Sequence, residues 1–117
     1  MTTQEAMALI QAEVAHVWMV RTFVKHSPEA EQHPEVMEIA RAGFDYALAL
    51  EKFRAVSDAE AYVAMARRKL PKLKRAADEF TTLAPGVSDH TNYRQAVASM
   101  NASVRRLEEI FAGLAVG

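Results

Sequence analysis

The apolar residues of this chain recur at helical spacing in four successive stretches, and this periodicity constrains the fold more than any other feature. The stretches cover residues 4–26, 34–55, 58–83 and 89–114, and only short breaks separate them. Helices of matched length that are joined by short loops usually pack antiparallel to their neighbours in the chain. We therefore predict an all-α fold, an antiparallel up-down-up-down four-helix bundle that forms one domain over residues 1–117.

Local signals predict where these helices begin. Thr2 and Glu5 have the spacing of a capping box, in which a hydroxyl and a carboxylate satisfy the first backbone amides. Ser57 and Glu60 repeat this pattern and should begin the third helix. The stretch 27–33 has no helical pattern, so we expect it to be flexible.

Prolines predict interruptions in the second half of the chain. Pro71 lies within the third predicted helix and removes one backbone hydrogen bond. We expect that helix to be kinked near Pro71 or divided there into two abutting helices. Ala84-Pro85-Gly86 is the clearest break in the chain, and Ser88 or Asp89 should cap the fourth helix.

Composition excludes several classes of function. The chain has no cysteine, which removes disulfides, thiolate nucleophiles and thiolate metal sites. A net charge of -1 excludes a chain-wide basic field for nucleic acid. The first residues lack the features of a secretion signal, and no apolar run is long enough to span a membrane. We expect a soluble cytoplasmic protein with no membrane partner.

The first predicted helix is apolar around well over half of its circumference. Its remaining face carries small or weakly polar residues, namely Ala8, Gln11, Ala15, Met19 and Thr22. A helix that is apolar nearly all round is buried nearly all round. Because most soluble oligomers are two-fold symmetric, we predict a homodimer through this helix. The alternative is a solvent-exposed face of small residues.

Three polar residues lie within or beside the apolar arc of the same helix: Glu13, His16 and Arg21. Charges in such a position need partners. An ion pair between helices, or side chains that reach the edge of the arc, would provide them. A polar site inside the bundle is the alternative. Glu13 and His16 have the Glu-x-x-His spacing of di-iron bundles, but those sites need the motif twice and it occurs here once.

The predicted topology brings three histidines to one end of the bundle. His26 ends the first helix, whereas His33 and His90 precede the second and fourth. Convergent imidazoles suit zinc, nickel or iron. A metal or small-ligand site at this end is therefore an alternative to ordinary loop chemistry, although our leading interpretation includes no cofactor.

Arg21 and His26 are separated by four residues, a spacing that resembles the short Arg…His motif of HEPN-type helical bundles. Some members of that family cleave RNA at a dimer interface. The resemblance implies an arginine that holds phosphate and a histidine that moves protons. It covers only six residues, and in that family the pair lies late in the fold rather than in the first helix.

A basic run in the third predicted helix carries six of the fourteen cations of the chain. Such a face could bind phosphate backbones or an acidic partner. No aromatic residue is interleaved to stack bases, so a solvated helix face is the favoured interpretation and nucleic acid is not the partner we expect. The cations are Arg67, Arg68, Lys69, Lys72, Lys74 and Arg75.

The sequence therefore favours a non-enzymatic protein–protein interaction module that acts as a homodimer. The alternative is a metal-binding, ligand-binding or RNA-cleaving site at the end of the bundle that carries His26, His33 and His90.

Overall fold

The structure is a computed structural model that describes the backbone of residues 1–116 and the side chains of residues 1–114. Over the described residues it contains helices and no strand, which confirms the all-α prediction. The helices are α1 (Thr3–Lys25), α2 (Glu29–Gln32), α3 (Pro34–Ala55), α4 (Ala59–Val87) and α5 (Thr91–Val116).

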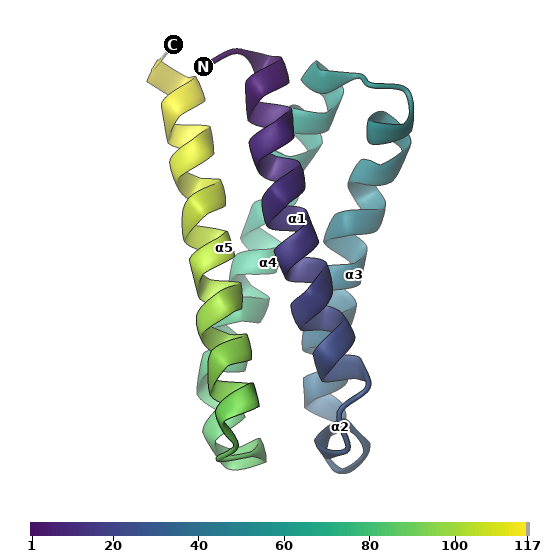
Figure 1. Cartoon of the computed structure of the whole chain (residues 1–117), viewed down its shortest axis with the longest axis vertical. Helices are drawn as coiled ribbons and strands as arrows, with labels where there is room; N and C mark the ends of the chain where they lie inside the picture. Colours follow the sequence, from purple (N-terminus) through teal and green to yellow (C-terminus); the bar gives the residue numbers. More distant parts are fainter. Residues whose placement is uncertain (117) are drawn as a thin grey trace.

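The four long helices lie side by side along the long axis of the molecule, which measures 43 × 26 × 19 Å (Figure 1). In this view α1 and α4 descend, whereas α3 and α5 ascend. α1 packs against α3 and α5, and α4 packs against the same two helices. α1 also contacts α4, so the core lies between all four long helices.

Buried aromatic residues tie these helices together. Tyr62 and Phe80 of α4 and Tyr93 of α5 are the bulkiest fully buried side chains among the described residues. The Tyr46 hydroxyl of α3 donates to the Ala66 carbonyl of α4 over 2.8 Å. Burial raises the pKa of Tyr62 to about 12 and also raises the pKa of Tyr46. The core therefore favours the neutral phenols.

One predicted capping box is confirmed and the other is wrong. Thr2 and Glu5 exchange the expected hydrogen bonds at the start of α1, each over 3.0 Å. The backbone amide and the hydroxyl of Thr2 lower the pKa of the Glu5 carboxyl. α4 is capped by Asp58, whose carboxylate accepts from the Ala61 amide over 3.1 Å. Ser57 has a φ of 56° and closes the end of α3, so the next residue is the first that can cap α4.

The break predicted at Ala84-Pro85-Gly86 is also wrong, because α4 continues to Val87. Ala84 is buried, and Val87 packs against the core one turn further on. This packing outweighs the hydrogen bond that Pro85 removes in the last turns of the helix. α4 also continues through the exposed Pro71, so it is not divided into two helices there.

The segment 27–33, expected to be flexible, contains the single turn of α2, which packs against α3. Ala30 within it is buried. Ser27 is buried too, and its hydroxyl donates to the Val24 carbonyl over 2.8 Å and accepts from the Tyr93 hydroxyl. Tertiary contacts therefore anchor a segment that has no helical pattern of its own.

Candidate functional site

Exposed large hydrophobic side chains are concentrated on α1 and α3. Met19 of α1 is 65% exposed and Leu48 of α3 is 58% exposed. Leu9, Trp18 and Met37 are exposed to a smaller degree on the same two helices. Among the described side chains, α4 and α5 carry no exposed large hydrophobic residue.

A ridge of small residues runs along the outer face of α1. Ala8, Ala12, Ala15 and Met19 are all exposed and follow one another at intervals of three or four residues. This spacing places them on one side of the helix. We call these four residues the alanine ridge.

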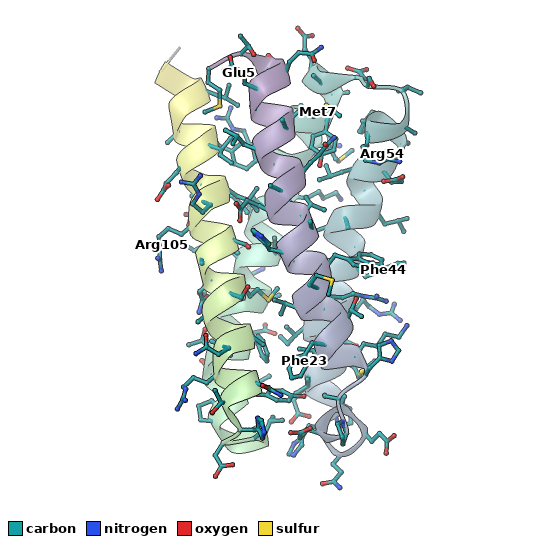
Figure 2. All side chains as sticks on the ribbon, in the orientation of Figure 1. Glu5, Met7, Phe23, Phe44, Arg54 and Arg105 are labelled. Atoms are coloured by element: carbon teal, nitrogen blue, oxygen red, sulfur yellow. The ribbon has the colours of Figure 1, made fainter. Side chains whose placement is uncertain are left out.

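A groove of about 550 Å³ lies beside the alanine ridge, between α1 and α3. Phe44 and Arg54, both labelled in Figure 2, line it toward the middle and the upper end of α3. Its apolar wall also includes Val14, Ala15, Trp18, Met19, Ala47 and Leu48.

The charged groups on the rim of the groove satisfy one another. Arg54 donates to both carboxylate oxygens of Glu51, over 2.6 and 2.8 Å. This pairing lowers the pKa of Glu51 and raises that of Arg54. The surface that the groove leaves available for a partner is therefore mainly apolar.

Arg21 lies half-buried against two aromatic rings that contact each other, and it has no ion pair with a carboxylate in the described part of the chain. The carbon atom of its guanidinium is 4.5 Å from the centroid of Trp18 and 5.1 Å from that of Phe44. The ion pair between helices expected for Arg21 is therefore replaced by cation–π contacts.

Glu13 and His16 do not join Arg21 in a single polar site. The Glu13 carboxylate lies 3.4 Å from Nδ1 of His16, one turn further along α1. The Glu13 side chain is only 12% exposed, whereas His16 is 62% exposed. His16 lines a shallow hollow between α1 and α5, whereas Arg21 lies on the side of α1 that faces α3.

Two of the three histidines predicted to converge share a pocket. His26 and His90 line a hollow of about 600 Å³ between the end of α1 and the start of α5, whereas His33 pairs with Glu35 over 3.3 Å. Nδ1 of His90 accepts from the Asn92 amide over 3.0 Å.

His90 therefore caps α5, in place of the Ser88 or Asp89 that the sequence suggested. A neutral imidazole whose Nδ1 accepts this bond carries its proton on Nε2 and leaves no lone pair for a metal ion. Within the described residues no three His, Cys, Asp or Glu side chains are arranged to hold a metal ion. The structure thus lends no support to the metal alternative.

Arg21 and His26 do not converge either. Five residues along a helix separate two side chains by about 140°, and here Arg21 and His26 line different pockets. Within one chain the pair therefore lacks the geometry that RNA cleavage requires.

Three cations of the basic run of α4 contact the two neighbouring helices, α3 and α5. Arg67 donates to the Phe111 carbonyl of α5 over 2.7 Å, and Lys74 lies 3.5 Å from Glu108 of the same helix. Lys72 lies 3.8 Å from Asp45 of α3. Half of the six cations thus connect α4 to its neighbours.

The sequence prediction placed Ala8, Ala15 and Met19 on the exposed face of α1, as the structure does. It also included Gln11 and Thr22, which are only partly exposed, and it missed Ala12, Leu48 and the groove. Leu48 lies outside the apolar stripe that Ala47 and Leu50 continue along α3. The position of Leu48 outside this stripe was the sequence feature that could have indicated an exposed apolar surface on α3.

Comparison of the chain with protein-family models, with curated proteins and with solved structures finds no match. Within residues 1–116 no helix is both long and apolar enough to cross a membrane. The surfaces of the chain itself are therefore the basis on which a function is assigned.

Proposed function

We propose that this protein is a non-enzymatic protein–protein interaction module that acts as a homodimer through α1. The observation that carries this proposal is the exposed alanine ridge, flanked by the apolar groove and by Leu48. Contiguous apolar surface on a small protein commonly marks an interaction site.

A second copy of the chain suits this surface because the alanine ridge of one copy is complementary in shape to the antiparallel ridge of the other. If two α1 helices cross antiparallel with Ala12 opposite Ala15, then Ala8 of each copy lies opposite Met19 of the other. A small residue then faces a large one, as close packing favours.

Leu48 supports the same arrangement. It lines the groove together with Val14 and Ala15, so it lies level with the middle of the alanine ridge. A two-fold axis at that level places Leu48 of one copy close to Leu48 of the other. Met19 and Leu48, the most exposed large hydrophobic side chains of α1 and α3, would then be covered together.

We further propose the finer architecture: an antiparallel up-down-up-down four-helix bundle, with α2 as a single turn in the first connection. The alternating directions of the long helices support it (Figure 1). The missing amide of Pro71 supports a kink in α4. The cytoplasmic location stays a prediction.

The experiment compares Ala15→Glu with Ala64→Glu by sedimentation equilibrium. Both alanines are exposed on a long helix, but Ala64 lies in the second turn of α4. We expect the wild type and Ala64→Glu to have the mass of two chains, and Ala15→Glu to have the mass of one. An unpaired carboxylate buried by association costs several kcal/mol.

Far-UV circular dichroism should show the same helicity for all three proteins. A wild type that sediments as one chain, or an Ala15→Glu variant that remains a dimer, would contradict the proposal.

A further inference from the structure

A second, charged pocket lies between α1 and α3, toward the end of α1. It has a volume of about 320 Å³ and is separate from the apolar groove except that Phe44 lines both. Its lining includes three cations together with apolar side chains, namely Arg21, Lys25, Arg41, Met37, Ala40 and Phe44, and the carboxylates Glu38 and Asp45.

Arg21 is held in position at this pocket by its surroundings. Its stem passes Gly43, where an added Cβ would come within 3.2 Å of the Arg21 Cβ. Its guanidinium lies against the rings of Trp18 and Phe44, at 4.5 and 5.1 Å. Arg21 is therefore pre-organised, so a ligand would lose less side-chain entropy on binding to it.

The hydrogen bonds of this guanidinium are incomplete within the described residues. One terminal nitrogen donates to the Thr22 hydroxyl over 3.3 Å. The Nε atom is buried and has no hydrogen-bond partner among the described residues. A buried donor without a partner is costly, so the guanidinium of Arg21 is left incompletely satisfied at the edge of this pocket.

The charge of the pocket is not balanced by its own carboxylates. Arg21, Lys25 and Arg41 contribute three positive charges. Asp45 lies 3.8 Å from Lys72 of α4, and Glu38 is the other carboxylate at the pocket. With Asp45 offset by Lys72, two positive charges remain.

We propose that this pocket binds a small phosphate monoester. Such an ester is a dianion near neutral pH because its second pKa is about 6, and its charge matches the excess in the pocket. The planar fork of Arg21 suits two phosphate oxygens, and Lys25 and Arg41 add charge. The organic part of the ester lies against Met37 and Phe44, in a volume that exceeds the size of a bare phosphate.

This site is independent of the proposed dimer. Arg21 lies on the side of α1 that faces α3, whereas the alanine ridge points to solvent. The monomeric Ala15→Glu variant therefore keeps the pocket and should bind the same ligand. Failure of the dimer and failure of the phosphate site can thus be told apart.

The test is isothermal titration calorimetry with phenyl phosphate at pH 7.5 and low salt, on the wild type and three variants. Arg21→Lys keeps the charge but loses the fork, and we expect affinity to fall about tenfold. Arg41→Gln removes a charge from an exposed position and should weaken binding about threefold to tenfold. Arg105→Gln is the matched control, because Arg105 points away from the bundle on α5 (Figure 2), and it should change nothing.

Two further titrations define the ligand class. Inorganic phosphate should bind more weakly than phenyl phosphate, since it leaves Met37 and Phe44 uncovered. Benzoate should also bind more weakly, since it carries one charge. For phenyl phosphate, affinity should rise from pH 5 to pH 7.5 as the ester loses its second proton.

The proposal is overturned if 10 mM phenyl phosphate gives no binding heat, or if Arg105→Gln weakens binding as much as Arg21→Lys. Benzoate that binds as tightly as phenyl phosphate would overturn the assignment to phosphate. Circular dichroism checks that each variant is folded. If Arg21→Lys does not fold, Arg41→Gln decides, because Arg41 is exposed and unaffected binding by that variant contradicts the site.

Discussion

The α1–α3 side of this molecule differs from the α4–α5 side in what it exposes to solvent. On α4 and α5 the large apolar side chains are buried or half-buried over the described residues, and Phe80 and Leu107 have no exposed surface. On α1 and α3, Met19 and Leu48 are more than half exposed. α1 thus carries more apolar surface than the core of one chain can cover, which is the physical reason to expect a second surface against it.

The two sides also use their cations differently. On α4, Arg67 and Lys74 reach across to α5 and are satisfied there by a carbonyl and a carboxylate. On α1, Arg21 lies against aromatic rings and keeps a buried nitrogen without a partner in the described part of the chain. The contacts with α5 account for the two cations of α4, whereas no described residue satisfies the buried nitrogen of Arg21.

The largest expected effect is a difference in the free energy of unfolding between variants of a buried leucine and of an exposed one. Leu107→Ala on α5 should lower the free energy of unfolding by about 3 kcal/mol, because it leaves a cavity in the core. Leu48→Ala on α3 should lower it by less than about 1 kcal/mol, because that side chain is mostly exposed. Urea unfolding in the monomeric Ala15→Glu background measures both without a contribution from association.

In the otherwise wild-type protein, the two substitutions should affect self-association in the opposite order. Leu48→Ala should weaken the dimer, whereas Leu107→Ala should leave it unchanged as long as the chain is folded. Equal losses of stability for the two leucines would remove the distinction between the two sides.

A smaller effect concerns how closely the helices approach. Gly43 lies where α3 meets α1, and a Cβ there would be 3.2 Å from Arg21 Cβ and 3.3 Å from Val17 Cγ1. Gly43→Leu should therefore cost about 2 kcal/mol of stability through overpacking. Gly86→Ala on α4 meets no atom within 4 Å and should stabilise the protein by roughly 0.5 kcal/mol, since it removes a helical glycine.

Thermal unfolding of the two glycine variants tests this contrast. A melting temperature that does not fall for Gly43→Leu would show that the contact between α1 and α3 is loose rather than close.

The smallest effect lies at the boundary between the two sides, where Tyr46 of α3 donates to the Ala66 carbonyl of α4. Burial raises the native pKa of Tyr46 above its unfolded value of 10, so the native state holds a proton that the unfolded state loses. The stability from this group is present below pH 10 and is lost as pH rises above 10. Tyr46→Phe should cost about 1 kcal/mol at pH 7 through the lost hydrogen bond.

Urea unfolding at pH 7 and pH 11 tests the sign of this effect. The wild type should lose more stability than Tyr46→Phe between these two values, with a remaining loss in the variant because Tyr62 is also buried. Equal losses of stability in the two proteins would show that Tyr46 does not contribute to the loss of stability at alkaline pH.

Several features of the fold were predictable because they depend on residues close together in the chain. The Thr2–Glu5 capping box and the start of α3 at Pro34 follow from local hydrogen bonding and backbone geometry, and both are as predicted. The end of α4 was not predictable in this way. The burial of Ala84 decided it against the local preference of Pro85 to interrupt a helix.

The sequence by itself determined that this protein is helical and that α1 has too much apolar surface for one core, because side-chain periodicity along a helix is a local property. Only the tertiary structure decided that Leu48 adjoins that surface and that Arg21 lies against Trp18 and Phe44 without a carboxylate. These relations depend on the register between α1 and α3, and Gly43 lies where these two helices approach closely. The spacing of residues within either helix alone does not contain that register.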